Sequence, residues 1–378
     1  MTVPEPSAQV TGASPEQPTE PPSAVVATPT GRGLAASSWV WVLATYLGAL
    51  LIVLVGLAVV TVLAGASPER ALATALRDSL LTTAGLAQTL NRMTPLLLAA
   101  LAFSLAYHVG LFNIGMDGQL YAGAILATGL GFLLGTALPA ILLVPLLLLA
   151  GGLGGALFSA PAVLLRIRWG VNEIFTTVML NFVALYLVAY LCTGPWNDPI
   201  AGEAITRPLP FRAALPLLVP SGGGHSGIVL AVLLAVALAW FLSRTVFGLE
   251  VRSVGGNPRA ARFAGIALGR IQITAFCAGG ALAGLAGAIE VLGVYHRLLV
   301  GLSPNYGIIA ILVAVLGRNH PLWLIPATFL FAVLVAASDS LQRTAGLPAS
   351  AVLMIQGLAV LVVLVMEAVR ARRARFVV

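Results

Sequence analysis

The chain has 378 residues, of which 59% are hydrophobic and only 9% charged, and its formal net charge is +7. This composition, with a mean hydropathy of +1.01, excludes an ordinary soluble domain and indicates a protein that crosses the membrane several times. All twenty basic residues are arginine, which excludes chemistry that needs a lysine, including ATP hydrolysis at a P-loop.

Residues 1–38 are rich in Pro, Ala, Thr, Ser and Glu and lack the basic-then-apolar pattern of a signal peptide, so we expect a disordered cytoplasmic tail. Residues 39–369 predict an all-α, polytopic transmembrane helical bundle, and residues 370–378 a basic cytoplasmic tail. About ten spans are expected, at 39–64, 95–112, 119–138, 140–164, 174–193, 227–242, 271–291, 306–316, 322–337 and 349–368.

The distribution of arginine predicts the orientation of these spans. With ten spans and both termini in the cytoplasm, Arg166, Arg168, Arg318 and the tail arginines fall on the cytoplasmic side, as the positive-inside rule requires. The Pro-rich connection 194–226 then lies on the external side of the membrane. Residues 67–92 are predicted to form a polar, amphipathic segment. The span 306–316 is short and could be a broken or re-entrant helix.

Paired small residues recur within the predicted spans and indicate close helix packing without indicating a substrate. These pairs are Gly131/Gly135, Gly151/Gly155 and Gly280/Gly284. Near span ends, Glu290 and Arg297 could form an ion pair at the outer face.

The stretch LFNIGMDGQLYAGA puts Asn113, Asp117 and Gln119 between two apolar spans. A half-helix that starts here would direct its N–H groups and the positive end of its dipole into the bundle. A tight cytoplasmic turn between two helices would explain the composition equally well.

A second polar stretch, GVNEIFTTVMLNF, puts Glu173 at the start of a span and Asn181 eight residues later on nearly the same face. A Glu at a helix N-terminus is favoured by the helix dipole for structural reasons alone. An amide deeper in a span needs a partner or water, so Asn181 is a candidate for the substrate path together with Asn113, Asp117, Gln119 and Glu173.

The densest internal cluster of charge is the loop 244–270, with five arginines and one acid. Its middle predicts a short helix with Asn257 as N-cap, Pro258 at the first helical position and Gly265 as a left-handed C-cap. This helix would present one face made of Arg259, Arg262 and Phe263. The loop is either a positive-inside signal or a helix that docks on a cytoplasmic partner.

Three motifs, between about residues 95 and 270, resemble those of permease subunits of ABC importers for nucleosides, simple sugars and branched-chain amino acids. VRSVGGNPRAARFAGI resembles the coupling helix of that class, which rests in a groove of the ATPase subunit. FNIGMDGQ is similar to the FNIG-x-E-G-Q signature of the nucleoside/simple-sugar branch, with Asp117 where that branch usually has Glu. The NE and LN of the second polar stretch resemble its NE-x(6,7)-LN pattern.

The resemblance implies a permease with no catalytic site and no cofactor of its own, in the bacterial plasma membrane. It implies a cytoplasmic ATP-binding subunit as partner, a second permease copy or relative, and an external solute-binding protein; no nucleic acid is expected. Asn257, Pro258, Arg259, Arg262 and Phe263 would couple it to ATP hydrolysis. The alternatives are a branched-chain amino acid permease of the same class, an ion-coupled secondary transporter and a polytopic enzyme. The absence of catalytic motifs and of any His/Cys cluster in the sequence argues against the enzyme and against a metal site.

Overall fold

The computed structural model describes residues 76–219 and 222–344, together with isolated residues before and after them. The described α-helices are α3 (Thr83–Tyr107), α4 (Met116–Leu134), α5 (Ala140–Trp169), α6 (Glu173–Thr193), α7 (Gly227–Arg244), α8 (Val246–Gly256), α9 (Pro258–Phe263), α10 (Leu268–Glu290), α11 (Tyr306–Leu316) and α12 (Pro321–Thr344). Shorter elements are the π-helical turns η1 (Arg77–Leu81) and η3 (Val291–Tyr295), the 3-10 turn η2 (Phe211–Ala213), and the antiparallel strands β1 (Leu217–Val219) and β2 (Gly224–His225).

Six helices in this part of the chain are long and apolar enough to cross a membrane, namely α3, α5, α6, α7, α10 with η3, and α12. Two further predicted spans correspond to α4 and to α11, which has only 11 residues. The polytopic helical architecture is therefore confirmed. The predicted tails 1–38 and 370–378 and the spans 39–64 and 349–368 lie wholly or largely outside the described residues, so the total of ten spans and the side of the termini stay predictions.

The predicted boundaries around the first described span are wrong. A polar segment at 67–92 and a span at 95–112 were expected, whereas one 25-residue helix, α3, covers the end of the first and most of the second. Pro95 lies inside this helix, because neighbouring helices in a membrane bundle can satisfy the backbone groups that a proline leaves free. The helix ends early in a turn in which Gly110 has a φ of 74°. Arg92 therefore lies within a membrane-spanning helix.

Glycines bring α4, α5 and α10 into direct backbone contact. A Cβ atom at Gly155 would collide with the carbonyl oxygen of Gly280, and one at Gly123 would collide with that of Gly284. The predicted small-residue pairs on α5 and α10 thus form the helix crossing, as small residues do in membranes. The pair on α4 faces the connection 194–226 instead, through Gly131, Gly135, Leu209 and Pro210.

Two helices begin inside the bundle. Tyr306, the first residue of α11, is completely buried and contacts Arg92, nine residues into α3. Gly118, in the first turn of α4, contacts Asn181, eight residues after Glu173 at the start of α6. At about 1.5 Å per helical residue, these points lie about 12 to 14 Å from the ends of α3 and α6. The short span 306–316 is thus a broken helix, one of the forms predicted for it.

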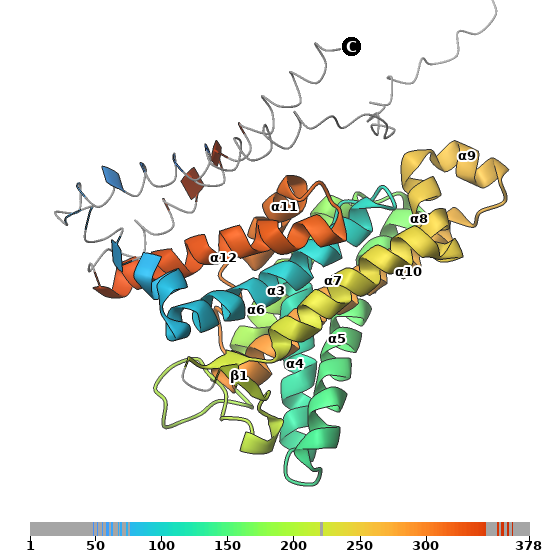
Figure 1. Cartoon of the computed structure of the whole chain (residues 1–378). Helices are drawn as coiled ribbons and strands as arrows, with labels where there is room; N and C mark the ends of the chain where they lie inside the picture. Colours follow the sequence, from blue (N-terminus) through green and yellow to red (C-terminus); the bar gives the residue numbers. More distant parts are fainter. Residues whose placement is uncertain are drawn as a thin grey trace, which may run out of the picture.

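The bundle has two different ends (Figure 1). At one end, α8 and α9 project beyond the long helices; at the opposite end lies β1 with the connection 194–226. We call these the α9 end and the loop end.

The glycine crossing gives a testable prediction about stability. Gly155→Ala should destabilise the protein by about 1 to 3 kcal/mol, because the new methyl group meets backbone atoms that cannot move aside. Thermal unfolding in detergent measures the effect. Gly152→Ala is the matched control on the same helix, since its Cβ would meet only Ala281 O at 3.6 Å. Equal melting temperatures for the two variants would contradict this account of the crossing.

Candidate functional site

The connection between α3 and α4, residues 108–115, runs along one face of α6. Glu173, Thr177 and Asn181 follow one another at intervals of four residues and therefore lie in one row on that helix. The Phe112 N–H donates to Glu173 Oε1 at 3.4 Å, and the Ile114 N–H to Thr177 Oγ1 at 3.3 Å. The Glu173 and Thr177 side chains thus each accept a hydrogen bond from a backbone N–H of a segment that has no secondary structure of its own.

The deepest member of the row makes two hydrogen bonds. The Gly118 N–H donates to Asn181 Oδ1 at 2.8 Å, and Asn181 Nδ2 donates to the Ile114 carbonyl at 3.0 Å. Glu173 at the other end is buried and forms an ion pair with Arg166 at 3.2 Å. The two predicted polar motifs therefore form a single structural unit, in which α6 fixes where α4 begins.

Asn113 and Gln119 bond to each other in both directions. Asn113 Nδ2 donates to Gln119 Oε1 at 3.0 Å, and Gln119 Nε2 donates to Asn113 Oδ1 at 3.1 Å. Asn113 Oδ1 also accepts from the Gly115 N–H at 2.9 Å. Both side chains are buried, so this amide pair closes the turn that opens α4.

Asp117 lies between the N-termini of two helices. It belongs to the first turn of α4, and its Oδ1 accepts from the Gly307 N–H, in the first turn of α11, at 2.9 Å. The same oxygen accepts from Ser303 Oγ at 2.5 Å, and Ser303 Oγ accepts from the Tyr306 N–H at 3.2 Å. The carboxylate thus satisfies orphan donors of α11 while it interacts favourably with two positive dipole ends.

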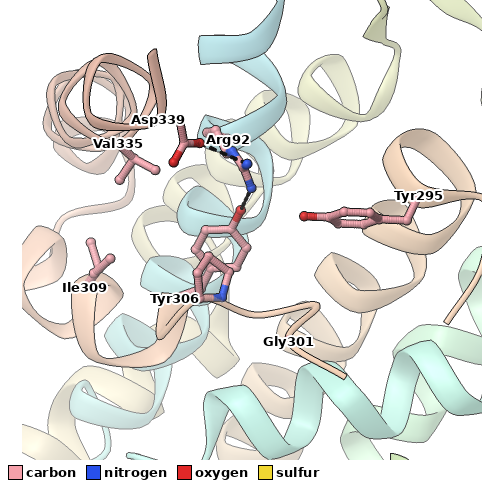
Figure 2. A pocket seen from close by; sticks show the side chains of 8 residues that line it. Arg92, Tyr295, Gly301, Tyr306, Ile309, Val335 and Asp339 are labelled. Atoms are coloured by element: carbon pink, nitrogen blue, oxygen red, sulfur yellow. Dashed lines mark hydrogen bonds and ion pairs between the residues drawn. The ribbon is translucent and has the colours of Figure 1, made fainter. Parts of the chain in front are cut away.

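A cavity of about 130 Å³ adjoins the start of α11 (Figure 2). Arg92 of α3 donates to the Tyr306 hydroxyl at 3.0 Å and pairs with Asp339 of α12 at 2.9 Å. Tyr295 of η3 points its hydroxyl toward this group from the other side. Charged and phenolic groups from four elements therefore meet at this cavity, where the Arg92 and Asp339 side chains are each 27% exposed.

These cavity residues were not among the site residues predicted from the sequence. An arginine within an apolar span would have been the signal, since a charge in a span normally marks a functional site. This signal was missed because the span was predicted to begin at residue 95, which placed Arg92 in a polar segment outside the spans.

The prediction of an outer-face ion pair between Glu290 and Arg297 is wrong. Arg297 pairs with Asp198 at 3.8 Å, whereas Glu290 is 1% exposed and interacts electrostatically with Arg92. The physical reason is that α10 continues without a break into η3, so Glu290 lies inside the span and not at its end.

The α9 segment has the predicted local structure. Asn257 Oδ1 accepts from the Ala260 N–H at 3.0 Å as N-cap, Pro258 is the first helical residue, and Gly265 follows with a φ of 81°. Arg259 and Arg262 are exposed, and the Phe263 side chain is 94% exposed. An aromatic ring flanked by two arginines at the tip of the molecule has the composition of an interface anchor.

α8 connects this segment to the rest of the site. A Cβ atom at Gly255 would collide with the carbonyl oxygen of His108, in the turn after α3, and Gln272 Nε2 of α10 donates to Val109 O at 3.3 Å. Burial lowers the pKa of His108, and the nearby charge of Arg252 adds to this effect, so the ring is neutral at pH 7. The turn at His108, which α8 contacts, is followed directly by the segment that α6 binds through Glu173, Thr177 and Asn181.

The row on α6 gives a second prediction. Asn181→Ala should lower the free energy of unfolding by about 2 kcal/mol, because the Gly118 N–H and the Ile114 carbonyl lose their partner inside the bundle. Thermal unfolding in detergent again measures it. Thr176→Ala serves as control, since the Thr176 hydroxyl bonds only to Asn172 O of the same helical turn. The account of the row is wrong if the two variants unfold alike.

Comparison with known proteins places the chain among transport proteins. It is 37% identical over 300 residues to a glucose ABC transporter permease protein of Haloferax volcanii, covering 77% of this chain and 78% of that protein. It is 32% identical over 271 residues to the nucleoside ABC transporter permease protein NupB of Lactococcus lactis, covering 69% and 74%. It is 31% identical over 291 residues to the guanosine ABC transporter permease protein NupP of Bacillus subtilis, covering 75% and 82%.

These relatives confirm the resemblance that the three motifs indicated. Residues 85–364 also match the family described as branched-chain amino acid transport system / permease component, and this range holds every residue of the site described above. The chain therefore belongs to this family of ABC transporter permeases.

Proposed function

We propose that this chain is the membrane permease subunit of an ATP-driven ABC importer that translocates nucleosides or simple sugars. The observation that carries the proposal is the α9 segment, a capped helix that exposes Phe263 between arginines and connects through α8 to the turn that opens the polar site. The relatives are permeases for glucose, nucleosides and guanosine, which supports the substrate class.

Three kinds of partner follow from this function. A cytoplasmic ATP-binding subunit receives α9, which puts the α9 end on the cytoplasmic side of the plasma membrane. An external solute-binding protein delivers substrate to the loop end, where the connection 194–226 exposes Ile200 and Phe211. A second permease, identical or related, completes the translocation path. ATP is used by the partner subunit, so this chain needs no cofactor and has no catalytic site.

The contacts suggest how ATP hydrolysis acts on the substrate path. Closure of the ATPase subunits moves α9 and α8, and α8 presses on the turn at His108. That turn continues into the segment held by Asn181, and then into Asp117, which anchors the start of α11. Movement at the α9 end thereby reaches Tyr306 in the cavity, and the continuous helices α3 and α10 with η3, which carry Arg92 and Tyr295, join the same two regions.

The two acids of the polar motifs, Asp117 and Glu173, favour an ABC permease over an ion-coupled transporter. Asp117 accepts two hydrogen bonds, from Ser303 and Gly307, and Glu173 is paired with Arg166. Acids that are already satisfied serve to hold structure, whereas a coupling-ion site needs acids free to exchange a proton or cation. We retain Asn113, Asp117, Gln119, Glu173 and Asn181 as residues of the substrate path, acting through the geometry of α4.

Purification of the tagged chain in mild detergent tests the proposal. Co-purification of an ATPase chain, followed by ATP-dependent uptake of adenosine, guanosine or D-glucose in proteoliposomes with the binding protein, is the expected result. A chain that purified alone and took up solute under an ion gradient would contradict it.

Substitution of the exposed aromatic ring tests the coupling helix. Phe263→Ala should weaken retention of the ATPase subunit and lower uptake about thirtyfold, because an aromatic anchor contributes about 2 kcal/mol to an interface. Membrane insertion should not change, since the ring is 94% exposed in this chain. Phe211→Ala is the matched control: its ring is 93% exposed at the loop end, and its loss should leave ATPase retention intact. Normal uptake with normal ATPase retention in Phe263→Ala would refute the docking role.

Transmission through α8 makes a separate prediction. Gly255→Ala should retain the ATPase subunit yet lower uptake per ATP hydrolysed about fivefold, because the methyl group displaces α8 from the His108 carbonyl. Gly256→Ala is the control, since a Cβ at that position meets nothing within 4 Å. If both variants transport at the wild-type ratio, the path does not run through this contact.

A further inference from the structure

We infer that the cavity bounded by Arg92, Tyr295, Tyr306 and Asp339 binds the ring hydroxyl groups of the transported solute. The permease itself would then recognise the sugar, or the sugar moiety of a nucleoside. The inference rests on the proposed function and names a binding site within it. Three observations carry it: the position of the cavity, its hydrogen-bonding groups and its volume.

The cavity lies where a translocation path has to pass. Arg92 is about 14 Å from the start of α3, and Tyr306 is the first residue of a helix that begins inside the bundle. Membrane transporters commonly bind substrate where broken helices start, because backbone groups there face a cavity and not lipid. In Figure 2, Tyr295 faces the cavity from one side, and Ile309 and Val335 line the other side.

The groups around the cavity suit a neutral polyhydroxyl compound. A sugar hydroxyl both donates and accepts, so its site needs donors and acceptors close together. The Tyr306 hydroxyl accepts from Arg92 and keeps its own proton to donate, while the Asp339 carboxylate offers lone pairs beyond the one that faces Arg92. The charges of Arg92 and Asp339 already compensate each other at 2.9 Å, so a zwitterionic amino acid would have to separate them, whereas a neutral sugar would not.

The volume fits part of one sugar ring. A cavity of about 150 Å³ accepts benzene, which has half the heavy atoms of a hexose, so the 130 Å³ found here receives one edge of a sugar ring with its hydroxyl groups. A purine base together with its ribose exceeds this space. A nucleoside would therefore insert its ribose, and the same cavity would serve a simple sugar.

The test uses the assembled transporter, with its ATPase subunit and binding protein, in proteoliposomes. Initial uptake rates are compared for adenosine against its 2′-, 3′- and 5′-deoxy forms, and for D-glucose against its 2-deoxy and 3-deoxy forms. The same binding protein serves every variant, so a change in the ratio between a solute and its deoxy form comes from the permease. Tyr306→Phe and Tyr295→Phe each remove one cavity hydroxyl, and Tyr190→Phe, on the exposed face of α6, is the control.

We expect Tyr306→Phe to lower uptake of the fully hydroxylated solute about tenfold and to change uptake of at least one deoxy form less than twofold, because only the former loses a partner. Tyr190→Phe should leave all ratios unchanged. If Tyr306→Phe does not assemble, the same change of ratio is required of Tyr295→Phe.

Equal losses for a solute and all its deoxy forms, in every cavity variant, would show a structural role and overturn the inference while leaving the proposed function intact. A wild-type complex that transports leucine, but neither adenosine nor D-glucose, would overturn the proposed function as well.

Discussion

The carboxylate of Asp117 holds together the part of the structure on which everything else depends. It belongs to the first turn of α4 and accepts hydrogen bonds from Ser303 and from the Gly307 N–H at the start of α11. Two helices that begin inside an apolar bundle expose N–H groups that lipid cannot satisfy. Asp117 accepts a hydrogen bond from such an N–H group of α11, that of Gly307, whereas Asn181 accepts one from the Gly118 N–H of α4. The Asp117 side chain also lies between the positive ends of both helices and thereby ties the start of α11 to the first turn of α4.

Backbone contact between glycines makes this arrangement sterically feasible. Gly123 on α4 and Gly155 on α5 each meet a glycine of α10 so closely that no Cβ fits between them. The three helices therefore cross with little side-chain volume between them, and α4 can start in the interior without leaving a void. On the opposite flank, the row of Glu173, Thr177 and Asn181 satisfies the extended backbone that leads to α4. Glycine packing on one side and hydrogen bonding on the other thus both fix the position at which α4 begins.

Sequence reasoning predicted much of this, and its failures have physical causes. Apolar length and arginine position identify the spans, and the Asn257 cap with Pro258 identifies α9, because these signals are local. The pairing of Asp117 with Gly307 could not be predicted, since the two are 190 residues apart and neither position has a distinctive pattern. Arg92 was misplaced because Pro95 resembles a helix boundary, whereas neighbouring helices allow α3 to continue past it. Glu290 was misread because the turn η3 prolongs α10 beyond the predicted end.

The one departure from the branch signature is explained by the same interaction. A glutamate would extend the carboxylate of Asp117 by one methylene, toward the first turn of α11. There the backbone already approaches so closely that a Cβ at Gly307 would lie 2.6 Å from Asp117 Oδ2. The shorter acid therefore matches the close approach of α11, and the hydroxyl of Ser303 bridges to the next N–H, that of Tyr306. Since Tyr306 also receives the hydrogen bond of Arg92, the start of α11 is held from two sides, by α4 through Asp117 and by α3 through Arg92, next to the cavity.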